Sequence, residues 1–161
     1  LLVDAVSDME GVAVFNLYEL SQEIAFNVDE WSKIISDASA VIYQFPFYWM
    51  SAPSLLKKWQ DEVFTFLSKT PAVAGKSLTV VTTTGSEYEA YRSGGRNRFT
   101  MDELLRPYQV SAIHSGMSWQ TPIVVYGMGT ADAGKNIAEG ANLYKQRVEM
   151  LIGSSNAGNN W

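Results

Sequence analysis

The fold is decided by residues 38–66, which read ASAVIYQFPFYWMSAPSLLKKWQDEVFTF. The uninterrupted apolar run over 38–45 is typical of a strand that is buried on both faces of a parallel sheet, and Pro46 is expected to end it. Pro53 then stands where a first helical residue would be, and apolar residues recur at helical spacing from there to Phe66. A buried strand followed by an amphipathic helix is the repeating unit of an α/β protein.

The same alternation continues along the rest of the chain and predicts one domain over residues 1–152, followed by a polar tail over 153–161. Its architecture is expected to be α/β, with three α/β/α layers and a doubly wound parallel sheet. Helices are expected at 1–8, 29–37, 53–66 and 132–152. A further helix is expected to begin at the Thr100–Glu103 capping box and to end at Gly116, with a break at Pro107. Strands are expected at 12–17, 38–45, 77–84 and within 117–128, and an irregular connection at 18–27.

Composition limits the chemistry that the side chains can supply. The 161 residues contain no Cys and a single His, His114, which excludes thiolate chemistry and multi-His metal sites. A formal net charge of −5 disfavours a nucleic-acid partner. His114 is expected near a helix C-terminus, where a structural role is favoured. With aromatic residues at 12% of the chain, the protein either does no chemistry or takes it from an organic cofactor.

Two loops are candidates for a ligand site because ligands of open α/β sheets bind beyond the carboxyl ends of the strands. Residues 44–53 carry four consecutive large side chains at 47–50. These either form a platform for a flat conjugated ring or seal the sheet end or a subunit interface. Residues 82–95 combine small hydroxylated side chains with Gly85, which permits close backbone approach to a ligand, although an ordinary solvated loop has the same composition.

A small basic group at Arg92, Arg96 and Arg98 lies in the second loop. It either receives a phosphate of a pyridine nucleotide or balances Glu87 and Glu89, and the second interpretation is favoured. Neither loop contains a nucleotide-binding fingerprint. The uncharged stretch 38–56 is interrupted by two prolines and is predicted not to span a membrane.

Three stretches resemble one known family. VIYQFPFYWMSAPSLLKKWQDEVF (41–64) is similar to the signature of the flavodoxin-like NAD(P)H:quinone oxidoreductases, and VVTTTG (80–85) with Tyr91 downstream is similar to the family's threonine–glycine segment and its active-site tyrosine. EAYRSGGRNRFTMDELLRPYQ (89–109) resembles the bacterial branch, which includes modulator-of-drug-activity-type reductases and ancillary flavoproteins of glutathione-gated potassium efflux systems. The resemblance extends from Leu1 to about Ile152.

The resemblance implies a flavodoxin-like fold that binds FMN or FAD and takes a hydride from NAD(P)H. It implies ping-pong transfer to a quinone or nitro compound, and a homodimer with the active site at its interface. It also implies a cytoplasmic protein, or one peripheral to the inner face of the membrane. By position, Tyr91 would be catalytic, and the cofactor-binding residues would be Pro46, Phe47, Tyr48, Trp49, Thr82, Thr83, Thr84 and Gly85.

The chain also departs from the family pattern. A central strand with a phosphate-binding loop has no counterpart before Leu1, and a segment that usually follows Phe66 is missing, so we expect the working protein to carry further residues. Asn97 stands where some members have a His, which removes a Tyr–His relay. Two alternatives stay open: a regulatory subunit of a potassium efflux transporter, and a single-electron carrier, which the nearby arginines disfavour.

Overall fold

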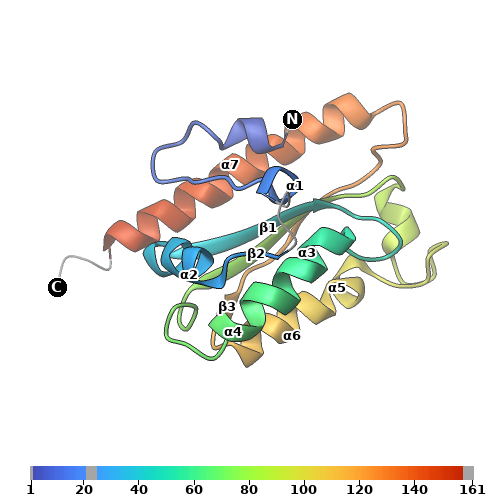
Figure 1. Cartoon of the computed structure of the whole chain (residues 1–161). Helices are drawn as coiled ribbons and strands as arrows, with labels where there is room; N and C mark the ends of the chain where they lie inside the picture. Colours follow the sequence, from blue (N-terminus) through green and yellow to red (C-terminus); the bar gives the residue numbers. More distant parts are fainter. Residues whose placement is uncertain (1, 21–24, 158–161) are drawn as a thin grey trace.

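Strand β2 (Ser77–Thr83) lies at the centre of a parallel sheet, and its residues 78–82 are buried. On one side it pairs with β1 (Ala40–Pro46) over the full length of both strands. On the other side it pairs with two short strands, β3 (Ser118–Trp119) and β4 (Ile123–Val125). This computed structural model describes residues 2–20 and 25–157 (Figure 1). Because all these pairings are parallel, the carboxyl ends of β1, β2 and β4 meet at one edge of the sheet.

Helices cover both faces of the sheet, as the sequence predicts (Figure 1). One face carries the 3-10 helix η1 (Val3–Ala5) and the long helix α7 (Ala133–Ala157). Two short helical turns, α1 (Leu17–Leu20) and the 3-10 helix η3 (Tyr88–Tyr91), lie in connecting segments. The other face carries α2 (Val28–Asp37), α3 (Ser54–Trp59), the π-helical η2 (Gln60–Phe64), α4 (Thr65–Leu67), α5 (Met101–Leu104) and α6 (Arg106–His114).

Each face has its own hydrophobic core. On the α3 side, the rings of Trp31 and Trp59 meet edge to face at 5.2 Å, and Tyr43 of β1 joins Trp59 at 5.9 Å. On the α7 side, Tyr144 and Val148 pack in a smaller cluster with residues of β2 and β4. The two cores hold the sheet as the middle layer of three.

The predicted strand at 12–17 is wrong. Residues 12–16 are irregular, and α1 begins at Leu17, the last residue of the expected strand, and continues into the expected connection at 18–27. A strand needs a neighbour to complete its ladder, and residues 12–16 have no such neighbour among the described residues. Phe15 instead packs edge to face on Trp31 at 5.4 Å. Residues 21–24 of the expected connection lie outside the described part of the chain.

The other elements follow the predictions with changes at their ends. The expected helix at 1–8 is only the single turn η1, which is held by buried Leu2 and Val6. Pro46 closes β1 as its last residue. Pro122, which has no N–H to donate, separates β3 from β4. Gly153 does not end the last helix, since α7 continues to Ala157, and residues 158–161 of the expected tail are outside the described range.

The predicted helix start and break around Thr100 are confirmed. The Thr100 side chain accepts from the Glu103 amide while the Glu103 carboxylate accepts from the Thr100 amide, which is a complete capping box. These hydrogen bonds, from the Thr100 backbone first and then from its side chain, lower the pKa of Glu103. The helix breaks at Leu105, just before Pro107, so α5 and α6 are separate elements. This break fixes the start of α5 near the carboxyl ends of the strands.

Candidate functional site

Backbone hydrogen bonds lock together the loops that follow β1, β2 and β4. The amide of Phe47 donates to the Thr83 carbonyl at 2.9 Å, and the amide of Thr84 donates to the Val125 carbonyl at 2.9 Å. The loop after β4 is tied further to the loop after β2, because Gly129 donates to the Gly85 carbonyl at 3.0 Å. Three separate loops therefore form one rigid rim at the edge where ligands of parallel sheets bind.

The loop after β1 is a tight turn that presents an indole ring to solvent. Tyr48 and Ser51 exchange backbone hydrogen bonds of 2.9 and 3.0 Å. Between them, Trp49 and Met50 adopt φ angles of 47° and 62°, a left-handed conformation that costs a non-glycine residue free energy. Trp49 is 97% exposed, so burial of its own side chain does not compensate for this strain. Strained backbone conformations cluster at functional sites, which makes this turn a candidate ligand contact.

The neighbouring residues of the predicted platform lie differently. Phe47 is buried and contributes to the core on the α3 side, whereas Tyr48 is exposed beside Trp49. Pro46 is the exposed last residue of β1. Of the rings in the predicted platform, Tyr48 and Trp49 are thus exposed, whereas Phe47 is part of the core.

The predicted threonines use their side chains inside the fold. The Thr82 hydroxyl is buried and donates to the Phe45 carbonyl at 2.7 Å, and the Thr84 hydroxyl donates to the Ser86 carbonyl at 2.7 Å. Thr83 is half-buried and Gly85 is exposed. This segment therefore offers a ligand its backbone and Thr83, while Thr82 and Thr84 hold the loop in shape.

Tyr91 lies on η3 between rings from two different loops. Its ring centroid is 6.2 Å from Phe47 and 5.9 Å from Tyr126, and only 6% of the residue is exposed. Tyr126 in turn meets Tyr88 edge to face at 5.3 Å. The predicted catalytic tyrosine is thus held by aromatic contacts at the same rim as the Trp49 turn.

Sequence reasoning missed Tyr126, although the residue follows directly after β4. Applying the strand-end rule to the fourth strand would have identified it. Burial is the largest cause that raises the pKa of Tyr126 to about 12, and the nearby Tyr88, Asp102 and Tyr91 add to it. At neutral pH the Tyr126 hydroxyl therefore stays protonated and can donate a hydrogen bond.

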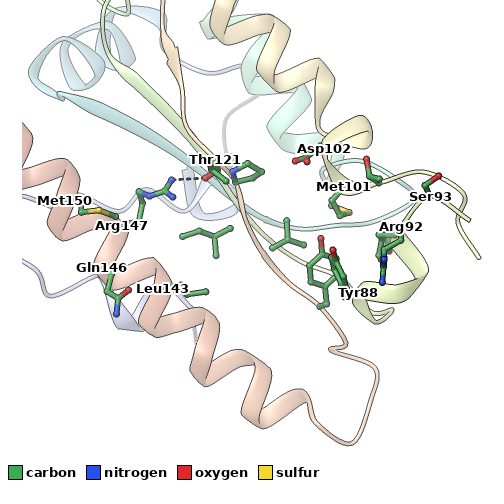
Figure 2. Close-up of a pocket in the computed structure, with 16 residues that line it drawn as sticks. Tyr88, Arg92, Ser93, Met101, Asp102, Thr121, Leu143, Gln146, Arg147 and Met150 are labelled. Atoms are coloured by element: carbon green, nitrogen blue, oxygen red, sulfur yellow. Dashed lines mark hydrogen bonds between the residues drawn. The ribbon is translucent and has the colours of Figure 1, made fainter. Parts of the chain in front are cut away.

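A cavity of about 560 Å³ opens beside these tyrosines, along the outer edge of β4 (Figure 2). Its lining includes Tyr88, Tyr91 and Tyr126 at one end and residues of α7 at the other. It contains none of the predicted residues at 46–49 and 82–85. The structure therefore separates the predicted site into the Trp49 rim and an adjoining groove, and Tyr91 belongs to both.

The interpretation that the basic group balances nearby carboxylates is confirmed for Arg92, which forms an ion pair with Glu89 at 3.0 Å. Arg96 instead donates to the neutral Ser86 hydroxyl at 2.6 Å. His114 is exposed at the end of α6, far along the chain from these loops. Within residues 2–20 and 25–157, no cluster of three or more His, Asp or Glu residues could hold a metal ion.

The sequence profile of a family described as having a flavodoxin-like fold matches residues 2–148. The chain belongs to this flavodoxin-like family. Among curated relatives, it is 34% identical to the uncharacterized NAD(P)H oxidoreductase YdeQ of Bacillus subtilis, over 92% of this chain and 77% of that protein. It is also 33% identical to the glutathione-regulated potassium-efflux system ancillary protein KefG of Pectobacterium atrosepticum, over 78% of this chain and 71% of that protein.

Two solved structures are similar to this fold. General stress protein 14 of Treponema denticola, solved in complex with FMN, has a TM-score of 0.82 and 27% identity, covering 93% of this chain and 88% of that chain. An NADPH-quinone reductase of P. pentosaceus has a TM-score of 0.75 and 27% identity, covering 91% of this chain and 85% of that chain. Among the described helices, none has the length and apolar character needed to cross a bilayer.

Proposed function

We propose that this chain is a flavin-dependent NAD(P)H oxidoreductase that reduces a quinone or a nitro compound. The observation that carries the proposal is the Trp49 turn, where a left-handed backbone holds a 97% exposed indole in a loop that is hydrogen-bonded to the end of β2 through Phe47 and Thr83. The FMN complex of a relative and the names of an NAD(P)H oxidoreductase and an NADPH-quinone reductase support the same activity.

The residues at the rim fit a planar, polar-edged cofactor such as FMN, with FAD as the alternative. Tyr48 and Trp49 offer ring faces for stacking. The half-buried Thr83 and the exposed backbone at Gly85, where no heavy atom lies within 4 Å of an added Cβ, leave room for the polar edge of such a ring to approach. When bound, the flavin supplies the two-electron transfer between NAD(P)H and the acceptor, so the protein needs no cysteine, metal or histidine for that step.

The role that we assign to Tyr91 is to stabilise negative charge during the reaction. The aromatic contacts with Phe47 and Tyr126 fix the orientation of its ring. A hydroxyl held in this way donates a hydrogen bond to an oxygen on which charge develops, as an oxyanion donor does. The low polarity around the three rings strengthens that interaction.

The exposed ring of Trp49 also supports a homodimer with the site at its interface. Exposed aromatic clusters of this kind mark interaction surfaces, and Tyr48 and Met50 on the same turn are exposed as well. A partner subunit would cover the turn and exclude water from the reacting groups. The cytoplasm, where NAD(P)H is available, is the expected location.

A second candidate function is a regulatory flavoprotein subunit of a potassium efflux transporter. The 33% identity to KefG favours it. The two functions are compatible, because a regulatory subunit can retain the reductase site.

The proposal is tested with the purified full-length protein and added FMN or FAD. After gel filtration we expect one flavin to be retained, to lose its absorbance when NADPH or NADH is added without oxygen, and to regain it with a soluble naphthoquinone. Failure to retain either flavin would rule out both functions. A retained flavin that neither nucleotide reduces would rule out the reductase and leave the regulatory subunit.

A further inference from the structure

The groove along β4 has the dimensions of a separate small-molecule site. Its volume of about 560 Å³ falls within the range of ordinary ligand pockets. The outer edge of β4 forms its floor, the start of α5 forms one wall and α7 the other (Figure 2). Neither the proposed cofactor site nor the comparisons with relatives assign a ligand to it.

A wall of tyrosine rings divides this groove from the Trp49 turn. Tyr91 contacts Phe47, which directly precedes the turn, and it also contacts Tyr126, which lines the groove. Tyr88 completes the wall at 5.3 Å from Tyr126. The groove thus ends in aromatic faces and hydroxyl groups, which suit a flat ring with an oxygen substituent at its edge.

The opposite end of the groove carries a half-buried cation. Arg147 of α7 donates from Nη1 to the Thr121 carbonyl at 2.7 Å (Figure 2). This acceptor is neutral, and no carboxylate lies within 4.0 Å of the guanidinium in the part of the chain that the structure describes. The bond fixes the guanidinium while its other N–H groups remain available, which is the arrangement that binds a carboxylate well.

Apolar side chains connect the two ends. Leu143 and Met150 lie one helical turn to either side of Arg147 and are 55% and 58% exposed. Met101 lies on the opposite wall, at the start of α5, and Val124 lies on the floor formed by β4. This strip can cover the faces of a planar ring system that reaches from the guanidinium toward the tyrosines.

The remaining charges of the groove decide how a ligand is oriented. Asp102 stands on the α5 wall near Tyr126, where its charge contributes to the raised pKa of that tyrosine. Arg92 is already paired with Glu89 and lies over the Tyr88 ring at 5.6 Å. A second anionic group at the tyrosine end would meet Asp102, so the favoured ligand carries one negative charge, at the Arg147 end.

We propose that this groove binds a planar aromatic monocarboxylate, with its carboxylate on Arg147, its ring on the strip formed by Leu143, Met150, Met101 and Val124, and its far edge at the Tyr88–Tyr126 wall. Such a ligand would contact Tyr91 from the side opposite Phe47. The assignment stands on the lining of the groove alone and does not require the proposed reductase activity.

The test measures binding of 2-naphthoate and its neutral isostere 2-naphthamide by isothermal titration calorimetry, with and without saturating FMN. We expect 2-naphthoate to bind about tenfold or more tightly than the amide, in the range of one charge-assisted hydrogen-bond pair. Arg147→Gln should abolish this difference. Lys145→Gln removes the same charge from an exposed position of α7 that does not line the groove, and should leave it unchanged.

Leu143→Trp provides a second variant that does not touch the cation. Because Leu143 is 55% exposed, the larger ring can be accommodated without disturbing the core and should fill the groove, weakening both ligands. Absence of binding, equal affinity for acid and amide, or binding that Arg147→Gln and Leu143→Trp leave unchanged would overturn the proposal. Competition of 2-naphthoate with FMN would also overturn it, since the ligand would then occupy the Trp49 rim. Failure to retain FMN would contradict the proposed function but not this site, which the flavin-free titration tests.

Discussion

The amide of Gly129 donates a hydrogen bond to the Gly85 carbonyl at 3.0 Å, and a Cβ atom on Gly129 would lie 3.0 Å from that same oxygen. The loops after β4 and β2 therefore approach so closely that a side chain at position 129 would crowd the backbone of the other loop. This contact holds two sides of the proposed cofactor site at a fixed separation, although the two glycines are far apart in the sequence.

Gly129→Ala should separate the two loops by a few tenths of an ångström. We expect a loss of about 1 kcal/mol in the free energy of unfolding and several-fold weaker FMN binding, because an added methyl group must displace backbone atoms. Urea unfolding and flavin fluorescence titration measure the two effects. Gly134→Ala is the control, since no heavy atom lies within 4 Å of its added Cβ. Equal effects of both substitutions would contradict the role of the contact.

Gly140→Ala should be among the more damaging substitutions in α7. A Cβ at Gly140 would lie 2.3 Å from Cγ2 of Val125, so the helix would have to move away from β4. We expect a loss of about 1–3 kcal/mol in thermal or urea unfolding. Gly153→Ala in the same helix meets nothing within 4 Å and should instead add up to about 1 kcal/mol through helix propensity. If Gly153→Ala also destabilised the protein, the close contact between position 140 and Val125 would not explain the loss of unfolding free energy.

Trp49→Ala should separate binding from stability. The ring is 97% exposed, so its removal should leave the melting temperature unchanged, while FMN affinity falls roughly 3- to 10-fold with the lost stacking. Trp49→Gly should raise the melting temperature, because glycine adopts the φ of 47° without strain, and should weaken FMN equally. The control Phe66→Ala removes a 59% exposed ring from α4 and should leave the FMN affinity unchanged. Unchanged FMN affinity in both Trp49 variants would place the flavin elsewhere.

Tyr91→Phe should slow turnover while preserving the fold. The substitution retains the ring contacts with Phe47 and Tyr126 and removes only the hydroxyl. We expect kcat to fall roughly 10- to 1,000-fold with little change in KM, as for the loss of an oxyanion donor. Tyr88→Phe, whose ring is 54% exposed, is the matched control and should change kcat little. A similar decrease in both variants would indicate that the hydroxyl of Tyr91 has no specific role.

Alkaline pH should destabilise the protein through its buried tyrosines. Burial raises the pKa of Tyr144 to about 12 from 10.0, so the unfolded chain loses this proton first. The corresponding stability is present below about pH 10 and is lost as the pH rises toward 12. Tyr144→Phe removes this dependence, and the difference in urea midpoint between about pH 8 and pH 11 should shrink. The exposed Tyr48→Phe is the control; an equal decrease for it would contradict the assignment.

Elements that carry a local signal could be predicted from the sequence. The apolar run that forms β1 and β2, the Thr100–Glu103 capping box and the break before Pro107 all depend on neighbours within a few residues, and all appear as expected. The segment 12–17 failed for the opposite reason. Its β-rich composition is local, but a strand exists only where a second strand completes the hydrogen bonds, and that requirement is not encoded in the segment itself.

The candidate site likewise contains residues that the sequence indicates and residues that only the structure brings together. The aromatic loop and Tyr91 are visible in the sequence, because rings after a buried strand stand out. Tyr126 and Arg147 do not stand out in the sequence. Tyr126 follows the short strand β4, and Arg147 lies on a helix surface where charged residues are common. Only their meeting along the edge of β4 makes them part of a groove.

The sequence by itself determined the α/β alternation, the position of the aromatic loop and the absence of cysteine chemistry, because these follow from periodicity, turn residues and composition without knowing which residues meet in space. Only the tertiary structure decided that the Thr82 and Thr84 hydroxyls donate to backbone carbonyls within the fold. It also decided that Tyr91 lies between Phe47 and Tyr126, and that Arg147 and the tyrosines line opposite ends of one groove. These relations join residues from separate strand–helix units, and the parallel sheet brings those units together only once its ladder and both cores have formed.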